Sequence, residues 1–457
     1  MADVEGSTRL PHEVWVLVAA NFVIAAGFGL VAPALPTFAR SFNVSVTAAS
    51  IVISAFAVAR LVFAPASGRL VTALGERRVY LTGISIVAVT TGACAFAADY
   101  WQLLIFRSVG GIGSTMFTVS AVALLIRVTP PPMRGRASGL WGTGFLLGNV
   151  TGPLLGGGLL TISLRAPFLV YAGMLFIAVA IVWWFLRHST LAAPVTDDDA
   201  PTFSLRTALR HRAYTAALAS SFANGWAVFG VRVSLVPLFV EEVLHRDGAF
   251  AGTALAVFAA GNVVMLLASG KLADTIGRKP MIVLGLLVAG GGTIWVGFTE
   301  SVPLFLAATV VSGLGSGMLT PPQQAVVADV VGQKARGGPV LAAFQMSADI
   351  GAVIGPVAAG LLADGVSYTA AFAVTGVLAL VAAIVWLPAP ETLPSRATET
   401  AHPTPDEALA SEVSPGVSPA ASPRPAPGSP PRSRWAGPRR PARPTPGRSH
   451  RPSRTRP

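Results

Sequence analysis

Charged residues are scarce in this sequence, and several familiar catalytic motifs are missing. Asp, Glu, Lys and Arg make up 12% of the 457 residues, and 53% of the residues are hydrophobic, whereas soluble globular proteins carry about 25% charged residues. The single cysteine, Cys94, excludes an intramolecular disulfide. No GxxxxGK(S/T) phosphate loop, HExxH or GxSxG occurs. We therefore expect an integral membrane protein that is not an enzyme, is not driven by ATP, and holds no cofactor or metal.

Long apolar segments are abundant. A helix needs about 20 mostly apolar residues to cross a hydrocarbon core of about 30 Å. The chain supplies twelve such segments, at 14–38, 47–68, 78–98, 101–127, 137–161, 166–187, 213–240, 249–272, 279–299, 302–328, 339–363 and 367–387. The first follows a polar start and is too long for the apolar region of a signal peptide, so we expect it to remain as a helix. The predicted fold is an all-α integral membrane protein with twelve transmembrane helices.

Basic residues predict the orientation, because Lys and Arg are retained in cytoplasmic loops. With the N-terminus inside, sixteen basic residues fall in cytoplasmic segments and only three, Arg40, Arg165 and Arg246, fall in outer loops. We expect a multi-pass plasma-membrane protein with both termini in the cytoplasm.

The C-terminal tail, 388–457, has a different composition. It contains eighteen of the thirty-six prolines, eleven basic residues and five acidic residues, and so carries +6 of the net charge of +12. Its few large apolar side chains cannot offset the entropy of ordering it. We expect a disordered cytoplasmic extension near anionic lipid headgroups, with no nucleic acid as partner.

Landmarks recur along the chain, which is typical of transporters built from duplicated bundles. The offset is 202 or 203 residues between Gly68 and Gly270, Gly75 and Gly277, Arg134 and Arg336, and Gly152 and Gly355. We predict two pseudo-symmetric six-helix bundles, 1–187 and 213–387, around a central cavity. The linker, 188–212, is expected to end in a short interfacial helix.

Four motifs resemble those of the major facilitator superfamily, and the resemblance covers residues 14–387. GKLADTIGRK resembles the loop signature after the second helix of each half, with Gly270, Asp274, Gly277, Arg278 and Lys279 in the expected places. RSVGGIGS resembles the fourth-helix motif that contains an intramembrane arginine, here Arg107. GLVAPALP and GNVTGPLLGG resemble, respectively, first- and fifth-helix motifs of the twelve-helix drug:proton antiporters. The resemblance implies alternating access and a small-molecule substrate exchanged for protons.

The GNVTGPLLGG motif has a physical interpretation. Gly148, Gly152 and Gly156 are four residues apart, so they form one stripe about 12 Å long on a helix. Without side chains, this stripe lets another helix approach closely, and Pro153 leaves the carbonyl of Asn149 without its helical donor. We expect a bendable contact at a bundle seam, which also includes Gly157 and is repeated by Gly355 and Pro356.

The loop signature predicts a conformational latch. Asp274 lies at the cytoplasmic end of the eighth helix, where it can accept hydrogen bonds from a helix N-terminus or pair with Arg134 and Arg136. In the first half, Gly68, Gly75 and Arg77 match the signature, but Thr72 replaces the aspartate. We therefore expect one strong latch, in the second half.

Ionisable residues within spans are functional candidates because burying them is costly. The resemblance assigns Arg107 to proton handling. Asp349 is the only carboxylate well inside a predicted span, and we take it as the proton site, with pairing to an arginine such as Arg107 as the alternative. Glu241 and Glu242, at the outer end of the seventh span, are better suited to a loop or gate.

Residues that could line a substrate cavity come from helices that face it in the superfamily. Candidates on these helices are Asn21, Phe22, Met116, Trp226 and Phe229, and the intramembrane arginines Arg60 and Arg232 are added as ionisable candidates without an assignment from the resemblance. The few fixed charges in the spans favour a lipophilic or amphipathic substrate. We predict a monomeric, proton-coupled exporter, with an uptake symporter for a metabolite and a nontransporting sensor that signals through the tail as alternatives.

Overall fold

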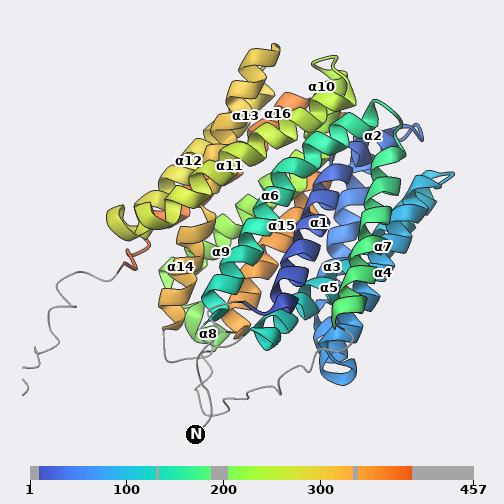
Figure 1. Ribbon diagram of the computed structural model, residues 1–457. Helices are drawn as coiled ribbons and strands as arrows, with labels where there is room; N and C mark the ends of the chain where they lie inside the picture. Colours follow the sequence, from blue (N-terminus) through green and yellow to red (C-terminus); the bar gives the residue numbers. More distant parts are fainter. Residues whose placement is uncertain (1–9, 130–132, 187–203, 333–337, 394–457) are drawn as a thin grey trace, which may run out of the picture. The chain divides into compact units, whose positions relative to one another are not determined.

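The computed structural model describes residues 10–129, 133–186, 204–332 and 338–393. Most of the predicted linker, 188–203, and of the predicted tail, 394–457, lies outside these residues. In the described part of the chain the secondary structure is helical (Figure 1).

The N-terminal half contains the first six spans. Its helices are α1 (His12–Val31) and α2 (Ala34–Arg40), which share the first span, α3 (Val46–Leu74), α4 (Glu76–Ala95), α5 (Tyr100–Val128), α6 (Arg134–Leu160) and α7 (Ala166–Leu186).

The C-terminal half follows the short helix α8 (Leu205–Ala208). Its helices are α9 (Arg212–Asn224), the π-helix η2 (Gly225–Arg232) and α10 (Val233–Glu242) in the seventh span, α11 (Gly248–Ile276), α12 (Arg278–Gly297), α13 (Val302–Gly317) and α14 (Thr320–Val331) in the tenth span, α15 (Gly338–Gly365) and α16 (Tyr368–Trp386). Each of the twelve predicted spans corresponds to helix.

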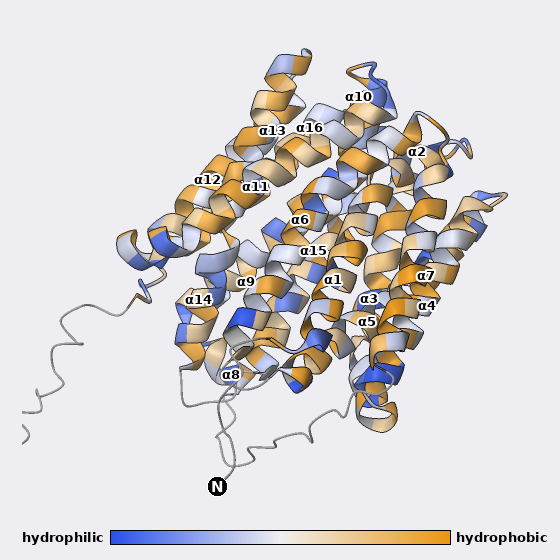
Figure 2. Cartoon of the chain, in the orientation of Figure 1, coloured by the Kyte–Doolittle hydropathy of each residue, from blue (hydrophilic) through white to orange (hydrophobic). Residues whose placement is uncertain are grey.

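Within the described residues, eleven spans are long and apolar enough to cross a membrane. The twelfth, α6, has 27 residues, but its many glycines lower its hydropathy. Large apolar side chains such as Val62, Phe176 and Leu267 are 49% to 73% exposed, as expected for helices surrounded by lipid rather than water. Hydrophilic residues gather at the ends of α4, α10 and α12 (Figure 2).

The two halves repeat each other in detail. Gly75, between α3 and α4, and Gly277, between α11 and α12, have φ values of 82° and 114°. Only glycine adopts this conformation readily, and it lets one helix follow another after a single residue. A Cβ at Gly111 would lie 2.4 Å from the carbonyl oxygen of Phe56, and a Cβ at Gly313 would lie 2.4 Å from that of Phe258. Both pairs are related by the offset of 202 found in the sequence.

The halves pack together through α3 against α15, α6 against α11, and α2 against α10. We call the end of the bundle that contains α2 the α2 end, and the end where Gly75 and Gly277 join their helices the loop end. Side chains of Ser45, Asp99, Asp247 and Ser367 cap the helices that start at the α2 end, which satisfies N–H groups that a helix cannot pair itself.

Candidate functional site

Polar side chains join the two halves at the α2 end. Arg40 donates from Nε and Nη2 to Glu242 Oε1 over 3.1 and 3.0 Å, and Thr37 donates to Glu241 over 3.1 Å. Tyr368 donates to the second oxygen of Glu242 over 2.8 Å, which holds this carboxylate in place. The two glutamates, expected to serve in a loop or gate, thus lie at the contact between the halves.

Asp364, near the end of α15, caps a helix of the other half. Its carboxylate accepts from the backbone N–H groups of Val46 and Thr47 over 3.0 and 2.8 Å, and from the Thr47 hydroxyl over 2.5 Å. A carboxylate at a helix N-terminus pairs free N–H groups and interacts favourably with the helix dipole. We call Thr37, Arg40, Thr47, Glu241, Glu242 and Asp364 together the seal.

Backbone contacts continue the seal. A Cβ at Gly157 of α6 would lie 2.7 Å from the Ala249 carbonyl oxygen, and one at Gly252 of α11 would lie 2.3 Å from that of Pro153. Between α3 and α15, Ser54 donates to the Val353 carbonyl over 2.7 Å. All the contacts between halves named here lie toward the α2 end.

The glycine stripe of α6 packs inside the N-terminal half. Cβ atoms at Gly148, Gly152 and Gly156 would lie 2.6 to 2.1 Å from atoms of α1, among them the carbonyl oxygens of Ala26 and Leu30. The close helix approach expected from the sequence is present, but the partner is α1. Of the α6 glycines expected at a bundle seam, Gly157 contacts α11 of the other half. The other three contact α1 of their own half.

The C-terminal half uses the same device. Gly355 packs on the backbone of Trp226. A Cβ at Gly230 would lie only 2.9 Å from the Cδ atom of the Pro356 ring. In the N-terminal half, the ring of Pro153 stands 2.7 Å from the Cβ position of Gly29. Pro153 and Pro356 are thus each accommodated by a glycine on the first span of their half.

The loop signatures of the two halves carry ion pairs of opposite polarity. In the N-terminal half Glu76 pairs with Arg127, and in the C-terminal half Arg278 pairs with Asp329. Glu76 and Arg278 are 202 residues apart, as are Arg127 and Asp329. The position of the pair is therefore repeated while its charges are exchanged.

A second contact holds the end of each half to its loop. Arg77 donates to the Leu186 carbonyl over 2.8 Å, and Lys279, 202 residues later, donates from Nζ to the Leu387 and Ala389 carbonyls over 2.7 and 2.8 Å. Glu391 accepts from the N–H groups of Arg278 and Lys279 over 3.0 Å each. Partial burial raises the pKa of Glu391, but hydrogen bonds from four backbone N–H groups outweigh it and hold this pKa below the ordinary value.

Among the residues that the structure describes, no helix N-terminus donates to Asp274, which is one of the two contacts expected of the latch. The Asp274 side chain is 68% exposed, and the ion pair that it makes is with Arg278, one turn away, at 4.0 Å. A Cβ at Gly68 would meet no described atom within 4 Å, and one at Gly270 would meet only Pro321 at 3.9 Å. The side chains of Thr72 and Arg134 lie outside the described part. The latch therefore stays a prediction, for a state in which the loop end closes.

Arg107 and Asp349 lie in different surroundings. Arg107 is 7% exposed, its guanidinium carbon lies 4.3 Å from the ring centroid of Phe56, and its Nε is buried without a partner. Asp349 lies on α15 and is partly exposed. No ion pair links the two among the residues that the structure describes, so the proposed pairing is not formed here.

Arg232 is buried in the C-terminal half. It is 5% exposed, donates from Nη2 to Ser312 over 2.7 Å, and lies 3.7 Å from the ring centroid of Phe258. Ser312 is also 3.0 Å from Thr293. The sequence analysis did not identify Phe258 or Ser312. Phe258 follows Phe56, the ring beside Arg107, by 202 residues, so the repeat relates the two rings that contact buried arginines.

The other cavity candidates are mostly packed within their own halves. Asn21, Met116 and Trp226 are 3% to 9% exposed; Asn21 donates to the Trp141 carbonyl, and Trp226 donates to Thr375. Phe22 contacts the glycine stripe through its backbone, Arg60 is half-buried on α3, and Phe229 is 46% exposed. The structure does not gather these residues around one pocket.

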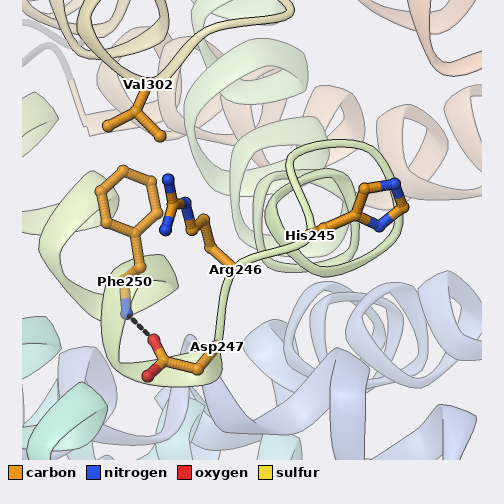
Figure 3. A pocket seen from close by; sticks show the side chains of 5 residues that line it. All are labelled: His245, Arg246, Asp247, Phe250 and Val302. Atoms are coloured by element: carbon orange, nitrogen blue, oxygen red, sulfur yellow. Dashed lines mark hydrogen bonds between the residues drawn. The ribbon is translucent and has the colours of Figure 1, made fainter.

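A shallow hollow lies on the surface at the α2 end. His245, Arg246, Asp247, Phe250 and Val302 line it, and Asp247 caps α11 by accepting from the Phe250 N–H over 2.9 Å (Figure 3). None of the site residues predicted from the sequence lines this hollow.

Known proteins are similar to this chain in sequence. The chain is 27% identical over 375 residues to the multi-drug resistance efflux pump PmrA of Streptococcus pneumoniae, an alignment that covers 78% of the chain and 90% of the pump. It is 27% identical over 345 residues to the class E tetracycline resistance protein of Escherichia coli, covering 73% and 84%. It is also 26% identical over 394 residues to multidrug resistance protein 1 of Bacillus subtilis, covering 81% and 95%.

Solved structures show the same fold at lower identity. A bacterial homologue of the human lysosomal transporter Spinster superposes with a TM-score of 0.69 at 19% identity, covering 83% of this chain and 97% of that one. A POT family transporter in complex with 5-aminolevulinic acid gives 0.71 at 12% identity, covering 82% and 96%. The sequence profile of the Major Facilitator Superfamily matches residues 17–248 and 217–443. The chain therefore belongs to the Major Facilitator Superfamily and is a membrane transporter.

Proposed function

We propose that the protein exports a small lipophilic or amphipathic compound from the cell in exchange for protons, by alternating access. The observation that carries this proposal is the seal. Its side chains join the two halves at the α2 end of the bundle. The names of the relatives, which include multidrug efflux pumps and tetracycline resistance proteins, support the direction of transport and the kind of substrate.

The seal has a defined side in this proposal. The distribution of basic residues predicts that the loop end faces the cytoplasm and the α2 end faces outward. The structure then corresponds to a state sealed toward the outside. Transport requires the seal to open while contacts form between the halves at the loop end, where Gly68, Gly270 and Asp274 lie.

Exchange for protons requires a group that binds and releases a proton during the cycle. Asp349 lies within a membrane-spanning helix, two residues before Gly351, which packs on the carbonyl oxygen of Phe222 in the helix opposite. A carboxyl in this position changes its solvation when α15 moves against the seventh span, and a change in solvation changes its proton affinity. We assign Asp349 to proton coupling and Arg107 to a supporting role in the other half.

Inside-out vesicles with an imposed proton gradient test this function. The wild type is expected to accumulate at least one compound from a panel of lipophilic fluorescent dyes when the interior is acidic, and collapse of the gradient should abolish accumulation. Asp349→Asn should lose gradient-driven accumulation but retain exchange of labelled for unlabelled dye. Glu300→Gln, a change at an exposed loop carboxylate, is the matched control and should behave as the wild type.

Other outcomes distinguish the alternatives. Gradient-driven uptake in right-side-out vesicles would replace export by symport of a metabolite. A sensor that signals through the tail should fall silent on deletion of residues 396–457, whereas a transporter should still move its solute.

A further inference from the structure

Arg232 is a cation in the interior of the C-terminal half that uses only part of its hydrogen-bonding capacity. Nη2 donates to Ser312, but Nε and Nη1 are buried without a partner. No carboxylate forms an ion pair with Arg232 within the described ranges. Ser312 is neutral, so no ion pair compensates the charge of the guanidinium among the described residues.

Such a charge requires a partner. Removing a guanidinium from water is costly, and buried charges are normally paired with charges of opposite sign or fully hydrogen-bonded. The face of Phe258 contributes a cation–π interaction, which stabilises the charge from one side but leaves the N–H groups at the edge unpaired. The missing partner is therefore an acceptor in the plane of the guanidinium.

Polar groups extend from Arg232 to a small cavity. Ser312 contacts Thr293, and Thr293 lines a cavity together with Asn224, Ser316 and Thr375. The side-chain oxygen of Asn224 is itself buried without a partner. This cavity is only large enough for about one water molecule and Arg232 does not line it, so what it adds near Arg232 is a further unpaired polar atom, unlike a purely apolar core.

Comparison of the two halves shows that the fold does not need this arginine. Gly29 and Gly230 occupy equivalent positions against Pro153 and Pro356 and differ by 201 residues. The same offset relates Arg232 to Val31, which is buried at 3% exposure. The N-terminal half therefore builds the equivalent helix contacts with an apolar residue, so structural repetition does not account for the charge at position 232.

We propose that Arg232 is the anchor of an anion-binding site in the C-terminal half. Nε and Nη1 are the donors, Phe258 supports the guanidinium, and Ser312 fixes its orientation. The ligand is an anion small enough to reach a buried guanidinium: either the carboxylate of a transported compound or a monovalent inorganic anion. This site does not depend on the direction of transport or on proton coupling.

Thermal unfolding of the purified full-length protein in detergent tests the site. One arm replaces a bulky sulfonate buffer anion, which is neither a carboxylate nor a small inorganic ion, by chloride at constant ionic strength. The other adds rhodamine B, which has a free carboxylate, or its ethyl ester, which does not, to the sulfonate buffer. A ligand that binds only the folded protein raises the unfolding temperature in a saturable way, on the order of 2 °C here. The fraction that remains monodisperse after heating is measured by size-exclusion chromatography.

Arg232→Gln should abolish the shift, and Arg246→Gln, at an exposed loop arginine, should retain it. Arg232→Lys keeps the charge without the planar fork and should weaken binding about tenfold. A shift with chloride identifies an inorganic anion as ligand, and a shift with rhodamine B but not with its ester identifies the carboxylate of a larger compound. Absence of any saturable shift in the wild type would overturn the proposal, whatever the stability of the variants, and so would an equal shift in Arg232→Gln.

Discussion

The contact between α6 and α11 permits a sharp test of the seal, through substitution of adjacent glycines. A Cβ at Gly157 would lie 2.7 Å from the Ala249 carbonyl oxygen and 3.1 Å from the Gly252 Cα, both across the interface, whereas a Cβ at Gly158 would meet nothing within 4 Å. Gly157→Ala must therefore push α6 and α11 apart at the α2 end, while Gly158→Ala adds the same methyl group to open space.

The expected magnitude follows from the packing. Overfilling a close contact between backbones destabilises it by about 1–3 kcal/mol. If the state that opens the α2 end does not contain this contact, its population relative to the sealed state rises by a factor of about 5 to 150. Gly158→Ala should leave this ratio unchanged, because its methyl group meets no atom of α11. Both variants gain the same small increase in helix propensity, so propensity cannot account for a difference between them.

Spin labels on both sides of the seal measure this ratio. Cysteines introduced at Ser41 and Arg246 lie at exposed positions in opposite halves, and native Cys94 is fully buried. Pulsed dipolar spectroscopy should show a larger population of long distances in Gly157→Ala than in the wild type or Gly158→Ala. An unchanged distance distribution in Gly157→Ala, or the same change in both variants, would refute the assignment of this contact to the seal.

Three further predictions concern the loop end. Asp274→Asn should reduce transport more than Thr72→Ala at matched expression, because only the second half carries the aspartate of the loop signature; equal activities would remove the latch. Glu76→Arg should lower the unfolding temperature by placing two like charges together, and the exchange Glu76→Arg/Arg127→Glu should restore most of it, since the C-terminal half already uses the reversed order; no recovery would mean that the pair is not interchangeable. Glu391 has a lowered pKa in the folded protein, so its stabilising contribution is present above its ordinary pKa and is lost as the pH falls through the lowered value. Hydrogen exchange at Arg278 and Lys279, corrected for intrinsic rates, should accelerate over that range in the wild type, and Glu391→Gln should show fast exchange throughout; identical profiles would exclude Glu391 as the cap.

Hydropathy and repetition predicted the fold well, because both can be read from the sequence without knowing which helices are neighbours. An α-helix that crosses lipid must be apolar along its length, so the twelve spans could be located without knowledge of their neighbours. The positive φ values of Gly75 and Gly277 explain why glycine recurs at the offset of 202.

The sequence did not predict which helices contact one another. The spacing of Gly148, Gly152 and Gly156 indicated a close approach but did not identify α1 as the neighbour, because any helix backbone fits a smooth stripe. Arg40 and Glu242 are separated by 202 residues, and their pairing depends on how two bundles meet, which no periodicity encodes. The exposure of Asp274 shows a further limit, since one sequence must serve several states and one structure contains the contacts of only one.

The hydrogen bonds named above that join the described parts of the two halves at the α2 end have the same direction. Thr37, Arg40, Val46, Thr47 and Ser54 of the N-terminal half donate, and Glu241, Glu242, Val353 and Asp364 of the C-terminal half accept. Arg40 and Glu242 are 202 residues apart and so occupy equivalent positions, where two identical copies of either half would place arginine against arginine or glutamate against glutamate. This ion pair therefore requires two halves whose sequences differ, and an assembly of two identical halves could not form it.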